Sequence, residues 1–181
     1  MARVPQITSK DQVAPDKQHI VDEIAGSRGR VSGPFSVLLH SPEIAGRVAH
    51  LGAYIRFDST LSGAERELAI CTAARECDCQ YVWSDHAPLA LKEGVRQEAI
   101  NVVASRGTLD SLTPDEALIV RFGRELFRDH RISEATFQAA QTHFGTQGVT
   151  ELTATMGYYS LLACTLNAFE VTPEPGTLRL P

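Results

Sequence analysis

Polar and hydrophobic positions along the chain recur at helical spacing, and capping residues mark where the helical segments begin and end. Ser41 directly precedes a proline, and Ser62 and Thr113 are each followed three residues later by a glutamate, which are N-terminal capping signatures. Gly145 follows a histidine and a phenylalanine and is a helix stop. The pattern predicts helices over residues 16–26, 34–39, 42–56, 63–76, 79–93, 95–105, 114–129, 133–144 and 148–169.

Runs that alternate polar and apolar residues, as a half-buried strand does, are nearly absent. We therefore predict an all-α fold, one helical domain over residues 15–170. Residues 1–14 and 171–181 are rich in proline and polar residues, so we expect an N-terminal arm and a C-terminal tail outside the core. No internal repeat or linker divides the chain.

Composition and charge narrow the class of protein. Of the 181 residues, 43% are hydrophobic and 22% charged, which is ordinary for a globular domain. A net charge of −5 without a clustered basic face argues against a nucleic-acid partner. No apolar run approaches the roughly 20 residues that cross a bilayer, and the N-terminus lacks the apolar centre of a signal peptide. We expect a cytoplasmic protein without a membrane partner.

The segment 63–76 is apolar on nearly all sides when drawn as a helix, with one narrow polar sector. Glu67 falls opposite that sector, among apolar residues. A carboxylate there is costly to ionise unless a cation or a donor is near, and such an environment can prepare a general acid or base. The alternative is a structural ion pair with an arginine such as Arg56 or Arg75.

In the next predicted helix, Cys79, Val82, Trp83, His86 and Ala90 share one face. Cys79 would lie in the first turn, where the positive end of the helix dipole favours a thiolate. His86 is two turns further on and can exchange protons near neutral pH. A single histidine on an apolar face is usually a core residue, but a carboxylate, a thiol and an imidazole that converge from adjacent helices indicate a site.

The runs ERELAI (residues 65–70) and CQYVWSDH (79–86), followed by Ala90 and Gly94, resemble the carboxymuconolactone decarboxylase family, which also contains the alkylhydroperoxidase D-like proteins. The pattern covers about residues 63–95, and looser similarity extends over most of the chain. The resemblance implies an alkylhydroperoxidase D-like helical bundle. It also implies a homo-oligomer, a trimer or a hexamer, with active sites at or near subunit contacts.

The peroxidase branch of that family carries C-x-x-C-x-x-x-H, and its second cysteine attacks peroxide. Here the first cysteine corresponds to Cys79 and the histidine to His86, whereas Val82 replaces the second cysteine. The resemblance therefore keeps Glu67, Cys79 and His86 as catalytic candidates. Cys77 and Cys79 form C-x-C instead, and their side chains would point apart on a continuous helix.

We accordingly predict a cofactor-independent lyase, a decarboxylase that acts on a small carboxylated lactone or keto-acid-like compound. His86 would donate the proton, with Glu67 as its orienting partner or a second acid. Trp83, Tyr81 and Val82 are expected to contact this small organic acid substrate.

Two other functions stay open. One is a thiol-dependent, alkylhydroperoxidase-like peroxidase or reductase that uses Cys79 with Cys77 or Cys71. The other is a non-catalytic binding or assembly protein of the same fold. We predict no metal and no cofactor, since Cys77, Cys79 and His86 do not have a usual zinc-site spacing and no His-Glu-x-x-His motif occurs.

Overall fold

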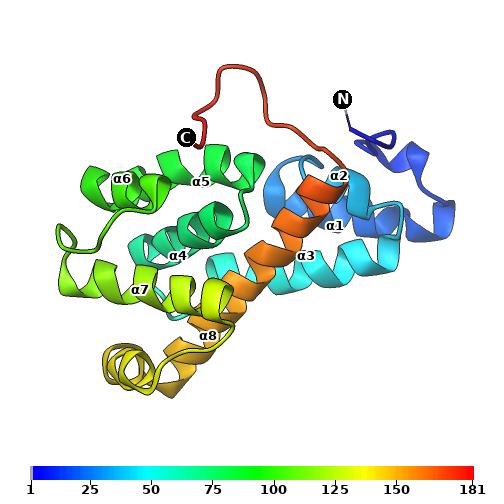
Figure 1. The fold of residues 1–181 in the computed structure, drawn as a ribbon. Coiled ribbons are helices and arrows are strands. Elements are labelled where there is room, and N and C mark those ends of the chain that lie inside the picture. The colour runs from blue at the N-terminus through cyan, green and yellow to red at the C-terminus, as the bar shows by residue number, and fades with distance from the viewer. Residues whose placement is uncertain (1) are drawn as a thin grey trace.

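A computed structural model describes residues 2–181, and helices account for all the regular secondary structure in that range (Figure 1). The all-α prediction is confirmed. The long helices are α1 (Gln18–Arg28), α3 (Pro42–Phe57), α4 (Gly63–Glu76), α5 (Gln80–Lys92), α6 (Gln97–Ser105), α7 (Pro114–Arg124) and α8 (Glu134–Ala168). Short elements are η1 (Lys10–Gln12), η2 (Pro15–Lys17), α2 (Phe35–Leu38) and the π-helical turn η3 (Glu125–Asp129).

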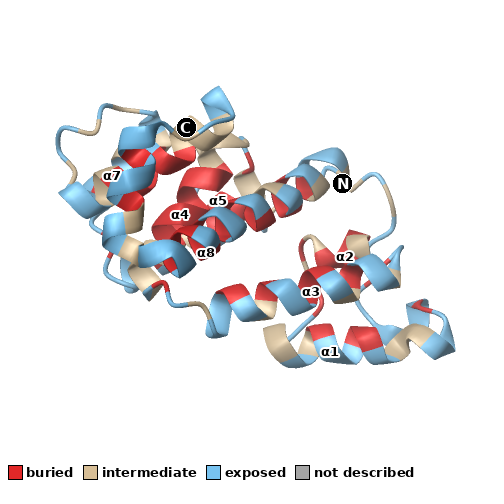
Figure 2. Ribbon diagram, turned by 90° about the horizontal axis from the view of Figure 1, so that it is seen from below, coloured by how far each residue is buried: buried red, intermediate tan, exposed pale blue. Residues whose placement is uncertain are grey.

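Helix α8 joins two groups of helices. On one side α4 packs against α5, α6, α7 and α8, and on the other α3 packs against α1, α2 and α8 (Figure 1). Because α4 has neighbours on all sides, every residue from Glu67 to Ala74 is buried, which gives the bundle its centre (Figure 2). The predicted burial of this segment is confirmed.

The capping signals act as the sequence indicates, with some differences. Ser62 and Thr113 both form capping boxes with the glutamate three residues on, whereas Ser41 begins α3 without a side-chain cap bond. Gly145, with φ 67° and ψ 174°, interrupts α8 where the stop is predicted. The predicted helix 114–129 is α-helical to Arg124 and then widens into the π-helical turn η3.

The chain ends are more closely packed than the sequence indicates. Ile7, Val13 and Val171 are buried in the hydrophobic core, so the prediction of ends that lie outside the core is wrong at these positions. The Arg3 amide donates to the carbonyl of Phe169 at 2.9 Å, which ties the two ends together. None of the helices between residues 2 and 181 is both long enough and apolar enough to span a membrane.

Candidate active site

The site is built where the buried face of α4 meets α5. The turn between the two helices is short, and Asp78 adopts a left-handed conformation there (φ 46°), which reverses the chain. As a result Glu67, only 6% exposed, lies opposite His86, and Glu67 Oε2 is 2.7 Å from His86 Nδ1. A carboxylate at this distance accepts a hydrogen bond from Nδ1–H. That bond fixes the tautomer, and Nε2 has no hydrogen-bond partner among residues 2–181.

The other neighbours of this pair hold the imidazole in place. The ring of Tyr159 meets that of His86 edge to face, with centroids 4.9 Å apart and an interplanar angle of 81°. Burial raises the pKa of the Tyr159 phenol, and the nearby Glu67 raises it further. On its other side, Glu67 Oε1 lies 3.7 Å from Arg66 Nε.

The structural alternative for Glu67, an ion pair with an arginine, is met by Arg66 at 3.7 Å, and the two arginines named as examples, Arg56 and Arg75, are wrong. Arg75 instead pairs with Asp78 and donates from Nε to the carbonyl of Ala104 at 2.7 Å. Arg56 lines a cavity beside His86.

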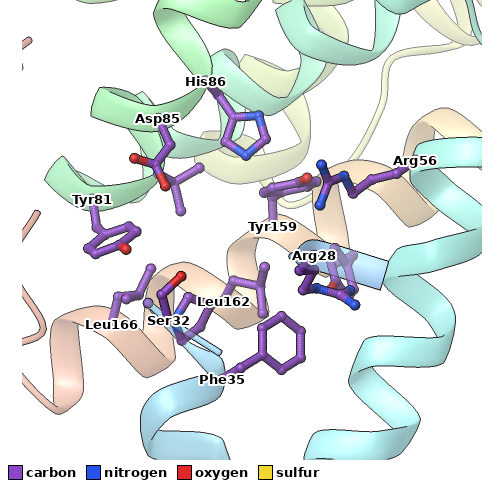
Figure 3. A pocket seen from close by; sticks show the side chains of 14 residues that line it. Arg28, Ser32, Phe35, Arg56, Tyr81, Asp85, His86, Tyr159, Leu162 and Leu166 are labelled. Carbon is purple, nitrogen blue, oxygen red and sulfur yellow. The ribbon is translucent and has the colours of Figure 1, made fainter. Parts of the chain in front are cut away.

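In front of His86 is a cavity of about 210 Å³ (Figure 3). Phe35, Val82, Leu162 and Leu166 supply its apolar wall. Figure 3 shows the Arg28 and Arg56 side chains on one side of the cavity and Asp85 with Tyr81 on the other, with the imidazole between them. The remaining lining residues are Ser32, Gly33, Pro34, Tyr158 and Tyr159. The volume exceeds the roughly 150 Å³ that holds a benzene molecule, so the cavity has room for a single ring with a substituent.

The structure brings only part of the predicted set to this cavity. Tyr81, Val82 and His86 line it, and Glu67 reaches it through His86. Trp83 is 1% exposed and does not line the cavity, so it cannot contact a ligand there as expected. Within the described chain, the indole N–H of Trp83 has no hydrogen-bond partner.

The expectation that Cys79 favours a thiolate is wrong. Cys79 is the N-cap of α5, as its position in the sequence implies, but it is completely buried and does not line the cavity. Burial raises the pKa of its thiol, and the backbone amides of Val82 and Tyr81 only partly oppose that rise.

The other thiols near α4 are equally unsuited to attack. Burial raises the pKa of Cys77 to about 11 and that of Cys71 well above its ordinary value. Cys71, Cys77, Cys79 and Cys164 are all free thiols. Across residues 2–181, no three histidine, cysteine, aspartate or glutamate side chains gather in a way that could hold a metal ion.

Sequence reasoning missed Arg28 and Tyr158 as lining residues, and it considered Arg56 only as a partner for Glu67. The glycine at position 52, inside the predicted helix 42–56, could have indicated that other side chains pack there. A glycine within a helix often marks a close approach by another side chain, and here Tyr158 and Arg28 pack directly against it.

Comparison with known proteins supports the resemblance. Residues 42–125 match the model of the Carboxymuconolactone decarboxylase family, which confirms the similarity predicted from the sequence. A search of curated protein sequences finds no significant match.

Several solved structures share the fold over nearly the whole chain. An alkylhydroperoxidase AhpD core, an uncharacterized peroxidase-related protein from Ralstonia eutropha JMP134, superposes with a TM-score of 0.77 at 20% identity and covers 96% of this chain and 93% of its own. A peroxidase-related protein from Silicibacter sp. TM1040 gives 0.74 at 15% identity, with 96% and 94% covered. A variant of the debrominase Bmp8 in complex with 2,3,4-tribromopyrrole gives 0.75 at 12% identity, with 97% and 94% covered. The chain therefore has the alkylhydroperoxidase D-like fold.

Proposed function

We propose that this carboxymuconolactone decarboxylase-like chain is a cofactor-independent lyase that decarboxylates a small carboxylated lactone or keto-acid-like compound. One observation carries the proposal: the buried Glu67 carboxylate is 2.7 Å from His86 Nδ1, and the imidazole lines a cavity of about 210 Å³. A carboxylate that orients an imidazole at a ring-sized cavity is an arrangement suited to proton transfer.

The reaction follows from this geometry. Loss of carbon dioxide breaks the bond between the carboxylate carbon and its neighbour, and the electron pair stays on that neighbour, delocalised into an adjacent carbonyl as an enolate. His86, which has taken up a proton from solvent at Nε2, gives that proton to carbon and returns to the neutral ring, and Glu67 stabilises the preceding imidazolium by accepting the hydrogen bond from Nδ1–H.

The competing function is a thiol-dependent peroxidase, which the names of some structural neighbours suggest. It needs a reactive thiolate at the cavity. Burial raises the pKa of Cys77 and Cys79, and neither thiol lines the cavity. These observations favour acid/base chemistry over sulfur chemistry.

We also propose that the chain forms a homo-oligomer, with the exposed apolar side of α3 in the contact. Ile44, Leu51, Tyr54 and Phe57 are each 42–62% exposed there. A second copy that covers this side would remove apolar surface from water. Sedimentation equilibrium of the wild type and of Leu51→Glu tests this, since the substitution should shift the protein toward monomer and an unchanged mass would contradict it.

A panel of lactone acids and keto acids, assayed for carbon dioxide release beside a peroxide-consumption assay, tests the function. With an active compound, His86→Gln should lower turnover by about 10²–10⁴-fold, because the proton donor is lost. Cys79→Ala is the matched control, since it alters the neighbouring thiol and should keep turnover. Full activity in His86→Gln contradicts the proposal, and peroxide consumption that depends on Cys79 supports the thiol alternative.

A further inference from the structure

Two guanidinium groups, Arg28 at the end of α1 and Arg56 near the end of α3, line one side of the cavity (Figure 3). Among residues 2–181 no carboxylate lies within the 4.0 Å ion-pair distance of either group. The arginines that are partly buried like Arg28 do have such a partner: Arg66, Arg75 and Arg124 each lie within that distance of an acid. The cavity therefore holds two positive charges that the protein does not neutralise.

Arg28 is held in a fixed orientation by neutral groups. Its Nη1 donates to Ser27 Oγ at 2.6 Å and its Nη2 donates to the carbonyl of Ala49 at 3.1 Å. Its Cζ lies 4.3 Å from the centroid of the Phe35 ring. These contacts use two of the five N–H donors of a guanidinium. The half-buried side chain thus keeps free donors.

The missing side chain of Gly52 makes this arrangement possible. A Cβ at residue 52 would lie 2.8 Å from Arg28 Nη2 and still closer to Tyr158 Oη, nearer than real Cβ atoms approach other atoms. Burial raises the pKa of Tyr158, while the Arg28 side chain and the charge of Arg56 oppose that rise. Both guanidinium groups lie on the same side of the cavity, where they can face one ligand group together (Figure 3).

We infer that Arg28 and Arg56 form an anion-binding subsite that holds an acidic group of the substrate and directs the rest of the molecule toward His86. The inference rests on the proposed function and specifies its substrate as a small, ring-sized organic anion. Planar guanidinium groups match carboxylates in bidentate geometry. Asp85, on the opposite side of the cavity, repels an anion and so favours one direction of binding.

The chemistry of the reaction also restricts which acidic group the subsite holds. An ion pair stabilises a carboxylate in the ground state and so opposes its departure as carbon dioxide. The group at Arg28 and Arg56 is therefore one that stays on the product. The departing carboxylate faces the apolar wall that includes Val82 and Leu162.

Calorimetric titration of the full chain with benzoate and with benzamide, its uncharged isostere, tests the subsite. The wild type should bind benzoate more tightly than benzamide. Removal of one charged hydrogen-bonding partner should weaken benzoate binding about 10- to 100-fold in Arg28→Gln and Arg56→Gln, and leave benzamide binding unchanged. Arg47→Gln is the matched control, because it removes the same charge from an exposed position of α3 that does not line this cavity.

Arg56 is exposed, so Arg56→Gln keeps the test valid even if Arg28→Gln fails to fold. Equal benzoate affinity in Arg56→Gln and wild type overturns the inference, as does a wild type that does not prefer benzoate to benzamide or binds neither. His86→Gln separates this test from that of the function. Loss of turnover in His86→Gln together with unaltered benzoate binding in the arginine variants would leave the proposed lyase standing without this subsite.

Discussion

Two glutamates are buried in this molecule to the same extent and have opposite surroundings. Glu67 in α4 is 6% exposed and Glu151 in α8 is 7% exposed. Glu67 takes one close hydrogen bond, from His86 at 2.7 Å, and lies beside a cavity. Glu151 takes five, at 2.7–2.9 Å, from the side chains of Tyr54, Ser59, Thr60 and Gln147 and from the Thr60 amide.

The consequence for Glu151 is a carboxylate that stays charged. Burial alone would raise its pKa, but the hydrogen bonds from Thr60, Gln147 and Tyr54 outweigh burial and lower the pKa to about 2. Such a group cannot accept a proton near neutral pH, and it joins the end of α3 and the following loop to α8. Burial therefore does not by itself mark a catalytic acid. What distinguishes Glu67 is that its partner is a titratable ring at a cavity.

The largest expected effect is on turnover, in Glu67→Gln. The amide cannot stabilise an imidazolium as a carboxylate does, so turnover should fall by about 100-fold or more. The change in size is small, so the midpoint of thermal unfolding should move by only a few degrees. Steady-state kinetics beside thermal denaturation checks this, and unaltered turnover would assign Glu67 the same structural role as Glu151.

The matching change in the other region is Glu151→Gln, which should alter stability and not chemistry. A neutral amide cannot satisfy all five donors, so the free energy of unfolding should fall by about 2–3 kcal/mol. Urea denaturation measures this loss. Turnover per folded molecule should equal that of the wild type, and a fall in turnover comparable to that of Glu67→Gln would end the distinction between the two regions.

A smaller and more specific effect is the pH dependence of the unfolding free energy that Glu151→Gln removes. The pKa of Glu151 is lowered from 4.5 to about 2 in the folded protein, so the unfolded state takes up the proton first as the pH falls. The stability that Glu151 contributes is fully present above about pH 4.5 and disappears toward pH 2. The difference in unfolding free energy between wild type and Glu151→Gln should thus shrink between pH 6 and pH 3. A difference that stays constant would contradict the lowered pKa.

The sequence predicted one of these regions and not the other, for a physical reason. The pair of Glu67 and His86 follows from local helical periodicity in two adjacent helices and from a compact family pattern. The donors to Glu151 come largely from residues 54–60, which are more than ninety positions away along the chain. The spacing of residues within one helix cannot predict a contact between segments so far apart in the sequence.

The two errors near the site have the same origin. The helix dipole at Cys79 is a local effect, but the burial that raises the pKa of its thiol comes from tertiary packing. Trp83 shares a helical face with His86, yet the cavity lies along one edge of that face and leaves the indole in the core. Helical periodicity gives the side of a helix that is buried, and the tertiary arrangement decides which part of that side adjoins a cavity.

The bare backbone at Gly52 has an evolutionary consequence. A methyl group there would lie 2.8 Å from Arg28 Nη2 and still closer to Tyr158 Oη, so the phenol, the guanidinium or both would have to move. Positions 28, 52 and 158 should therefore change together during divergence. Relatives that keep arginine, glycine and tyrosine at these three places are expected to keep the same packing of the phenol and the guanidinium against α3.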